Sequence, residues 1–349
     1  MIPSQCAGVF SAEVWSSADI GQLAGEVRRI MPQCPALLDP GVFLASLSSG
    51  SIPRVLVVRC GPEIVGVVCV KERKIAGIPI GLIYAEGTLG GLVLAETANR
   101  EAVLHVALEK LLALRRVQGL RLLVQPDGYE LKVAHDLAMS MGLSFCQAPF
   151  HSNHVRLPLP ASYEVFLDSL RRRTRRNFRY CRKQFAAAGH RYVPRISTAE
   201  IRAAADRLKE KCRFKTSTRD LERVWKWIAS VDRPFACGLR SRHGELLSVT
   251  AGFYDSMGAT MLLQLNDDMD FERDSMSLIL RGYLIESLIQ DGVPNLFFWG
   301  GVGGPLKRYA EDIPGILVFL NPASSGWQMA RSLVRILAPK RLQAYRWWS

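Results

Sequence analysis

Three apolar runs rich in β-branched residues follow one another in the first part of the chain. They read RVLVVRC (54–60), EIVGVVCVKERK (63–74) and IPIGLIYA (78–85), and Gly-Pro and Ala-Gly turns separate them. Runs of this length with turn signals between them predict an antiparallel meander. Helical spacing over about 99–117, the strand LRLLVQ, a helix near 130–141 and a strand near 143–148 complete the first half.

The spacing of apolar residues becomes that of a helix in the stretch FLDSLRRRTRRNFRYCRKQFAAAGHRY, residues 166–192. Its apolar or small residues recur at intervals of three and four, at Leu167, Leu170, Thr174, Phe178, Cys181 and Phe185. This spacing predicts one amphipathic helix that Ser162 caps at its start and Gly189 follows at its end. The eight arginines and lysines between residues 171 and 183 then cover the face opposite the apolar stripe.

The rest of the chain repeats the element order of the first half. Helices at about 198–213 and 219–230 precede the strands PFACGLR, LLSVTAGFY and ATMLLQLN; a helix at 275–290 then leads to the strand NLFFWG, the loop GVGGPLKRY and the strand ILVFL. Mixed sheets with helices on both faces predict the α/β (α+β) class. The repeated order predicts two tandem domains, residues 1–157 and 158–349.

Charge is distributed unevenly between these halves. The 349-residue chain has a net charge of +13, and residues 1–150 contribute 13 basic and 13 acidic residues, against 32 and 19 in the remainder. Within residues 151–226, 20 basic residues stand against 7 acidic ones. Such asymmetry indicates an anionic ligand, a nucleic acid or a membrane surface as partner. A solvated helix face is the simpler alternative for the arginines.

The cysteines and the chain ends indicate the cellular compartment in which the protein is expected. The eight cysteines have no regular spacing and no CxxC pair, so we expect buried thiols in a reducing environment. The first residues lack the pattern of a secretion signal, and no run of about 18 apolar residues occurs, which predicts a cytoplasmic protein. The last 24 residues, GWQMARSLVRILAPKRLQAYRWWS, have five basic and no acidic residues. Packing on the domain or peripheral contact with the inner face of an anionic membrane would both suit them.

Three segments carry a likeness to a known family. SLRRRTRRNFRYCRKQFAAAGHRY, the hairpin GELLSVTAGFYDSMGATMLLQLND and NLFFWGGVGGPLKRYAED resemble the Gcn5-related N-acetyltransferases (GNAT) in their CelD-like and FemAB-like branch, over about residues 160–315. The resemblance implies two GNAT-like domains, the first of them degenerate. It also implies transfer of an acyl group from acetyl-CoA or another acyl-CoA to an amine on a sugar, cell-envelope or polysaccharide precursor. In the Fem branch the implied donor is aminoacyl-tRNA.

Donor-binding residues follow from the resemblance and from the glycine-rich loop. The family's phosphate loop would fall at Arg273, Asp274, Ser275 and Met276, where its spaced glycines are absent, and an ordinary capped helix explains this segment equally well. Gly303 and Gly304 allow close backbone approach, and Lys307 can reach a phosphate. A plain turn is the alternative for this loop.

Acyl transfer also needs a base for the amine and a proton for the leaving thiolate. The candidates near the predicted site are Asp267, Asp268, Tyr283, Glu286 and Tyr309, of which Asp268, Tyr283 and Tyr309 are the predicted catalytic residues. A structural role is the alternative for each of them. Arg172, Arg176, Arg179 and Arg308 are the predicted ligands of an anionic amine-bearing acceptor, since guanidinium groups bind phosphate in bidentate fashion.

Other chemistry finds little support. His151 and His154 form an HxxH pair without a nearby carboxylate or cysteine, so no metal site is predicted. The motifs GxSxG, HExxH and GxGxxG are absent. Two alternatives stay open: a FemAB-like tRNA-dependent aminoacyl transferase, and a non-catalytic nucleic-acid-binding protein. The arginines show no interleaved exposed aromatic residues in sequence, so only phosphate contact is expected of the latter.

Overall fold

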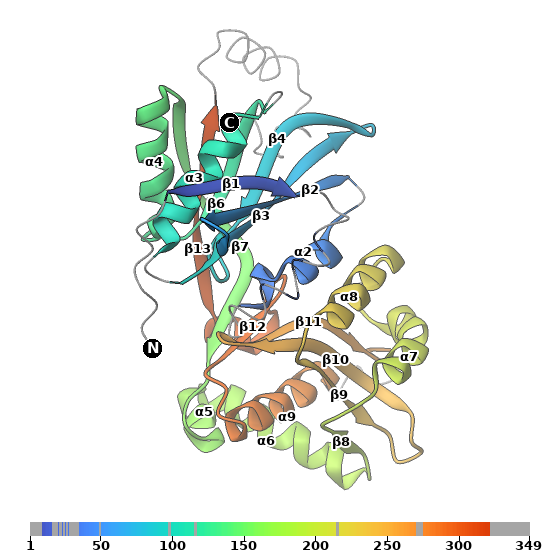
Figure 1. The fold of residues 1–349 in the computed structure, drawn as a ribbon. Coiled ribbons are helices and arrows are strands. Elements are labelled where there is room, and N and C mark those ends of the chain that lie inside the picture. The colour runs from blue at the N-terminus through green and yellow to red at the C-terminus, as the bar shows by residue number, and fades with distance from the viewer. Residues whose placement is uncertain are drawn as a thin grey trace, which may run out of the picture.

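The computed structural model describes residues 9–15, 35–48, 50–96, 99–114, 117–213, 216–269 and 275–321, together with residues 20, 23, 25 and 27. Arg273 and Asp274 of the expected phosphate loop, and the basic segment at the C-terminus, lie outside the described residues. The described part divides into two halves that stand one above the other in Figure 1.

The first half is built on the predicted meander. Its elements are β1 (Phe10–Trp15), η1 (Ala36–Leu38), α2 (Pro40–Ser46), β2 (Ser51–Cys60), β3 (Glu63–Ile75), β4 (Ile78–Glu86), β5 (Val93–Ala95), α3 (Arg100–Leu112), β6 (Gly119–Val124) and α4 (Tyr129–Met141). β2, β3 and β4 pair antiparallel in sequence order, and β6 lies parallel to β4. The turn residues between the three apolar runs therefore made the meander predictable.

The second half repeats this plan. It contains β7 (Ser144–Pro158), α5 (Tyr163–Ser169), α6 (Arg172–Ala187), β8 (Arg191–Val193), α7 (Thr198–Lys211), α8 (Thr218–Ser230), β9 (Pro234–Arg240), β10 (Leu246–Asp255), β11 (Gly258–Asn266), α9 (Met276–Gln290), β12 (Asn295–Phe298), η3 (Gly304–Arg308) and β13 (Glu311–Asn321). The predicted α/β class is confirmed, since both halves have a mixed, mostly antiparallel arrangement of strands flanked by helices.

The two sets of strands join edge to edge. The 13-stranded sheet has the order β1-β2-β3-β4-β6-β13-β7-β12-β11-β10-β9-β8, with β5 beside β3. β7 makes the connection because its first part pairs with β13 and its end, from Val155 to Pro158, pairs with β12. β13 returns from the second half and lies between β6 and β7, so Val318 and Leu320 belong to the core of the first half. The division at residue 157 stays a prediction.

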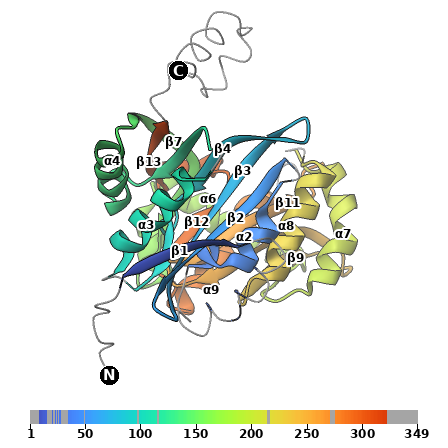
Figure 2. The ribbon, with the colours of Figure 1, turned by 45° about the horizontal axis from the view of Figure 1, so that its top comes forward.

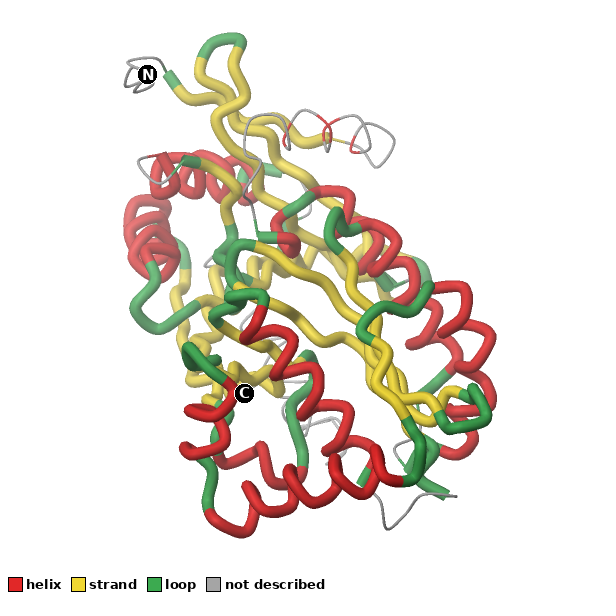
Figure 3. Tube along the Cα trace, turned by 90° about the horizontal axis from the view of Figure 1, so that it is seen from below, coloured by secondary structure: helices red, strands yellow, loops and turns green. Residues whose placement is uncertain are grey.

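Helices cover both faces of the sheet in each half, as Figures 2 and 3 show. In the second half, α5, α6 and α9 share one core with the sheet residues Met261 and Phe298, whereas α7 and α8 pack on the opposite face around Leu263 and Leu265. α2 of the first half contacts α8 of the second through Val42 and Trp227. The halves therefore meet on the α7–α8 side of the sheet.

Two details of the sequence analysis need correction. The predicted single amphipathic helix is two helices, because Leu170 and Arg171 have extended backbone between α5 and α6. The Arg171 N–H donates to the hydroxyl of Tyr309 at 2.7 Å, which holds this break in place. The predicted Ser162 cap and left-handed Gly189 are confirmed. Cys60 is disulfide-bonded, so not every cysteine is a free thiol; irregular spacing gave no sign of this pair.

One further property concerns membranes. Among the described helices, none combines the length and the apolar character needed to cross a bilayer.

Candidate functional site

β11 and β12 separate soon after they begin to pair. The two strands are parallel and are in register only at Ala259–Leu296, Thr260–Phe297 and Met261–Phe298, and the Trp299 N–H donates to the Met261 carbonyl at 3.0 Å. β11 then runs on to Asn266, while the chain after β12 turns into the glycine loop, residues 300–304. Beyond Met261, no strand in the described part of the chain pairs with this edge of β11, which leaves backbone groups for a ligand to bind.

Arg281 lies beside this opening, in the second turn of α9. Its Nε donates to the side-chain oxygen of Gln264 at 2.8 Å, and Nη1 donates to the carbonyl of Gly303 at 3.4 Å. Burial lowers the pKa of Arg281 to about 10, so the side chain is still a cation at neutral pH. In the part of the chain that the structure describes, no carboxylate forms an ion pair with it. A partly buried cation of this kind is suited to binding an anion.

A chain of buried polar groups fixes the position of Arg281. The Ser248 hydroxyl donates to Oδ1 of Asn266 at 2.6 Å, and the Gln264 amide donates to the same oxygen at 3.1 Å. Because the Gln264 nitrogen is used in this way, its oxygen faces Arg281. Ser248 is fully buried and Asn266 nearly so, which means that β10 and β11 supply a rigid support for the guanidinium group.

The described members of the predicted donor-binding set lie at the start of α9 and at the end of the glycine loop. Ser275 has a left-handed backbone (φ 51°) and begins α9 without a side-chain cap. The side chain of Met276 is buried in the core, so only its backbone faces outward. Gly303 and Gly304 bound the short helix η3, where Lys307 is exposed. The structure thus places these residues together at the start of α9 and in the loop after β12, and their role stays a prediction.

The predicted catalytic residues occupy different surroundings. Tyr309 follows η3 and accepts the hydrogen bond from Arg171. Asp268 lies just after β11 and accepts a hydrogen bond from the Arg213 backbone at 2.9 Å. The ring of Tyr283 is stacked between Arg182, whose guanidinium carbon lies 3.9 Å from the ring centre, and Tyr192 at 4.9 Å between centres. Of the three, Tyr309 lies closest in sequence to the glycine loop.

The other candidates for acid or base work form ion pairs. Asp267 is buried and forms an ion pair with Lys211 at 3.0 Å. Glu286 forms an ion pair with Arg182, the same arginine that stacks on Tyr283. These contacts give both carboxylates a structural role between helices and sheet.

The arginines of α6 have more carboxylate neighbours than the sequence indicated. Arg175 forms an ion pair with Asp168 at 2.5 Å, and Arg179 with Glu164 at 2.7 Å. Both acids come from α5, which lies beside α6 because the helix is broken at residues 170–171. Arg172 and Arg176 are exposed or half-exposed on the remaining face, and Arg308 is exposed on η3. The excess of basic over acidic residues in 151–226 thus did not indicate these ion pairs, and acceptor binding by the arginines stays a prediction.

A second candidate region lies between the halves and was missed in the sequence. A cavity of about 680 Å³, which we call the basic cleft, is lined by five cationic side chains and one carboxylate. They are Lys71, Arg73, Lys74, Arg121, Arg219 and Glu86. These cations come from β3, β6 and α8, and they are far apart in sequence. Burial lowers the pKa of Arg121; Tyr84 and Glu86 oppose this shift, and Arg73 adds a smaller lowering effect.

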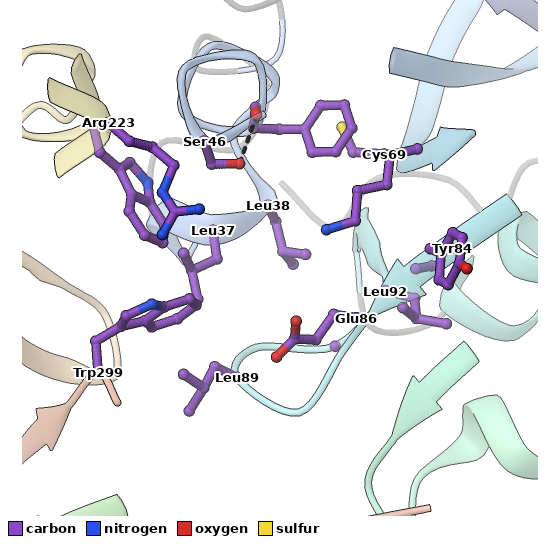
Figure 4. Close-up of a pocket in the computed structure, with 15 residues that line it drawn as sticks. Leu37, Leu38, Ser46, Cys69, Tyr84, Glu86, Leu89, Leu92, Arg223 and Trp299 are labelled. Atoms are coloured by element: carbon purple, nitrogen blue, oxygen red, sulfur yellow. Dashed lines mark hydrogen bonds between the residues drawn. The ribbon is translucent and has the colours of Figure 1, made fainter. Parts of the chain in front are cut away.

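An apolar pocket of about 210 Å³ adjoins the basic cleft and shares Lys71, Tyr84, Ala85 and Glu86 with it. Figure 4 shows Arg223 and Trp299 on one side of the pocket, Cys69 and Tyr84 on the other, and the Glu86 carboxylate pointing between them. The indole nitrogen of Trp227, also in the pocket wall, is buried and has no hydrogen-bond partner within the described ranges of the chain. An unsatisfied donor in a cavity wall is a place for a ligand oxygen.

His154 connects this region with the glycine loop. Its Nδ1 accepts a hydrogen bond from the Gly300 N–H at 3.0 Å, its ring stacks on Trp299 at 4.0 Å, and Nε2 lies 3.8 Å from a Glu86 oxygen. Burial lowers the pKa of His154, and Glu86 opposes that shift. The ring is therefore neutral at pH 7, with its proton on Nε2 toward Glu86.

Trp299 is where the two regions meet. Its backbone closes the β11–β12 pairing, while its indole packs on Trp227 at 4.8 Å between ring centres on the side of α2 and α8. Phe298, one residue earlier, faces the core that contains α9. Arg281 on α9 thus lies on one face of the sheet, and the two cavities lie on the other.

Several solved structures resemble this chain in overall fold. Over 87% of this chain and 96% of that one, FemX superposes with a TM-score of 0.61 at 12% identity. The chain shares its fold with FemX. L-PGS from Bacillus licheniformis gives a TM-score of 0.55 at 10% identity, covering 88% of this chain and 94% of that one. A conserved protein of unknown function from Bacteroides thetaiotaomicron gives 0.56 at 12% identity, covering 90% and 100%.

The resemblance to the GNAT-like FemAB branch is therefore confirmed as a likeness of fold. No family profile and no curated protein matches the sequence.

Proposed function

We propose that this protein is an N-acyltransferase that moves an acyl group, in the simplest case acetyl, from acyl-CoA to an amine on a sugar or cell-envelope precursor. The observation that carries the proposal is the opening between β11 and β12, beside which lies Arg281, a partly buried arginine with no carboxylate partner among the described residues. The fold shared with FemX and L-PGS supports the reaction class.

The donor lies on the α9 side in this proposal. Amide groups of the pantetheine arm pair with the free edge of β11, as an added strand would. The phosphates lie toward the start of α9, where backbone N–H groups near Ser275 and the cation of Arg281 favour negative charge. Lys307 approaches the same phosphates from the glycine loop. Arg273 is included among the proposed phosphate ligands only because of the family resemblance.

The acceptor lies in the basic cleft, where its anionic group contacts Lys71 and Lys74. Its amine nitrogen attacks the thioester carbonyl carbon, the C–S bond breaks, and the amine proton must be removed. Glu86 is the carboxylate placed in both cavities and is our candidate for the base, with the neutral ring of His154 beside it. The hydroxyl of Tyr309 accepts from Arg171 and keeps its own proton to donate to the leaving thiolate.

Calorimetric titration with acetyl-CoA and longer acyl-CoAs tests the donor. Wild-type protein should bind at least one of them, and Arg281→Gln should weaken binding by about thirtyfold or more, because it removes a charge-assisted contact in a buried site. Arg202→Gln, which changes a half-exposed arginine on α7, should bind as the wild type does. Absence of binding by the wild type to every acyl-CoA would remove acyl-CoA as the donor.

One observation favours aminoacyl-tRNA as the donor instead. Tyr180 is 61% exposed among the arginines of α6, so this face does contain an exposed aromatic ring, contrary to the sequence analysis. An exposed ring beside cations suits stacking on a nucleotide base as well as phosphate contact. Filter binding of tRNA should then decline steeply with salt, and both Tyr180→Ala and the pair Arg172→Gln with Arg176→Gln should weaken it. Retained tRNA affinity without any transfer would indicate the non-catalytic alternative.

A further inference from the structure

The β3–β4 hairpin ends in an apolar tip that protrudes from the sheet. The hairpin extends past the start of β2, since Ser51 pairs with Arg73 and the Gly50 carbonyl accepts from the Lys74 N–H. Figures 1 and 2 both show this turn, in blue to cyan, reaching away from the rest of the molecule. The hairpin tip, residues 75–79, reads IAGIP and has no polar side chain.

The tip is open to solvent in spite of this composition. Ile75 and Ile78 face each other across the turn and are 53% and 67% exposed. Single exposed apolar residues are common, but a cross-strand pair of isoleucines at the end of a protruding hairpin is a concentrated apolar surface. The tip therefore suits insertion into an apolar phase.

The backbone of the turn supports the same conclusion. Ala76 and Gly77 both have positive φ, 51° and 82°, as a two-residue turn of this kind requires. Asparagine, aspartate or glycine normally occupies the first position, because a Cβ is strained in the left-handed region. The chain keeps the apolar Ala76 there and tolerates this strain, so the whole tip is free of polar groups.

Cations surround the base of the tip. Lys71, Arg73 and Lys74 form what we call the basic collar, and all three also line the basic cleft. The one acid of this segment, Glu72, is buried; it is bound by Arg54 at 2.7 Å and by the Gly81 N–H at 3.2 Å. The negative charge of Glu72 is thus buried and paired with Arg54. The basic collar is therefore the charged part of the surface next to the tip among the described residues.

We infer that the hairpin tip docks on an anionic lipid bilayer, with Ile75 and Ile78 inserted among the acyl chains and the basic collar at the headgroups. Apolar side chains beside lysine and arginine are the combination that binds such surfaces. Charge complementarity selects an anionic membrane, since the collar would add nothing on a neutral surface. Docking places the mouth of the basic cleft at the level of the headgroups, whichever donor the enzyme uses.

Sedimentation of the full chain with vesicles tests this inference. Vesicles of phosphatidylcholine with phosphatidylglycerol should bind the protein, and vesicles of phosphatidylcholine alone should bind it much less. Ile75→Asn with Ile78→Asn should reduce binding to the mixed vesicles by roughly tenfold or more, because two apolar side chains no longer leave water. Arg73→Gln with Lys74→Gln should reduce the difference between binding to the mixed vesicles and binding to the neutral ones.

A matched control changes exposed apolar residues elsewhere. Met139 and Met141 on α4 are 71% and 40% exposed, and Met139→Asn with Met141→Asn should leave vesicle binding unchanged. Circular dichroism shows whether each variant is folded. If the isoleucine variant is unfolded, Arg73→Gln with Lys74→Gln is used to test the inference instead. Equal binding by the wild type and the isoleucine variant would overturn the inference. Loss of a lipid-free dimer in that variant would also overturn it, since a second copy would then cover the tip.

Discussion

The α6 face and the basic cleft are both rich in cations, but they differ in where the carboxylates lie. Seven basic residues lie close together in the sequence of α6, yet Glu164, Asp168 and Glu286 each pair with one of its arginines. In the basic cleft, five basic residues from three separate elements and one carboxylate, Glu86, are the charged side chains among the described residues of the lining. Charge density along the chain is thus a poor guide to charge density in space, because the fold brings acids to one region and cations to the other.

This difference predicts which region binds an anion. Lys71→Gln with Lys74→Gln should weaken binding of inorganic phosphate by up to about a hundredfold, since two charged contacts of about 1.5 kcal/mol each are removed. The matched double variant on α6, Arg172→Gln with Arg176→Gln, should retain binding within about threefold, since exposed single cations contribute little.

Phosphate-dependent stabilisation in thermal unfolding measures both effects, because a ligand of the folded state raises the melting temperature. The reverse result, with loss only in the α6 variant, would restore the sequence-based assignment of the acceptor to that helix.

A second prediction concerns Tyr283, which the sequence made catalytic and the structure places between Arg182 and Tyr192. Tyr283→Leu should destabilise the protein by about 2 kcal/mol, because it removes a cation–π contact and a stacked ring from the α6–α9 interface. Tyr283→Phe keeps both contacts and should stay within about 0.5 kcal/mol of the wild type in denaturant unfolding. If Tyr283→Phe lost turnover at unchanged stability, the hydroxyl would be catalytic after all.

The elements were more predictable than the contacts between them. Period and turn residues predicted the meander, α9 and the strand before the glycine loop, since these are local properties of the sequence. The break at Leu170 and the insertion of β13 between β6 and β7 depend on partners more than a hundred residues away. Local periodicity contains no information on such pairings.

The candidate site was predictable to the same extent. Ser275, the glycine loop and Lys307 were found because motif and element order locate them. Arg281 was missed, although it is the only charged residue in the first ten positions of the apolar helix MSLILRGYLIESLIQ. A lone arginine in an otherwise apolar helix is a signal that could have identified it, since a buried cation needs an anion. The basic cleft has no comparable signal, because its residues converge only in the folded chain.

The pH dependence of stability should reveal the contacts of His154 with Gly300, Trp299 and Glu86. Burial lowers its pKa in the folded state, whereas the unfolded chain titrates near the ordinary value of about 6.5. Below that pH the unfolded state binds a proton that the folded state does not, so the free energy of unfolding should fall with a slope of at most one proton. Protonation of Nδ1 would also end the hydrogen bond from Gly300.

Denaturant unfolding between pH 8 and 5 measures this effect as the difference between the wild type and His154→Gln, whose curve should be flatter. His135→Gln, at an exposed position on α4, provides the control and should follow the wild type. Parallel curves for the wild type and His154→Gln would mean that the pKa of His154 is the same in the folded and unfolded protein, with Glu86 balancing the effect of burial.

The smallest effect on folding is expected at Lys307, the predicted phosphate ligand nearest the glycine loop. Lys307 is exposed on η3, so Lys307→Ala should change the free energy of unfolding by less than about 0.5 kcal/mol. In the proposed site, however, the ammonium group approaches the donor phosphates opposite Arg281, and its loss should lower kcat/KM for the acyl donor several-fold. Because Lys307 and Arg281 would bind the same ligand from two sides of the opening, the double variant should lose less than the sum of the single losses. Additive losses would place Lys307 outside the donor site and make the glycine loop a plain turn, with Arg281 as the anion ligand on that face of the sheet.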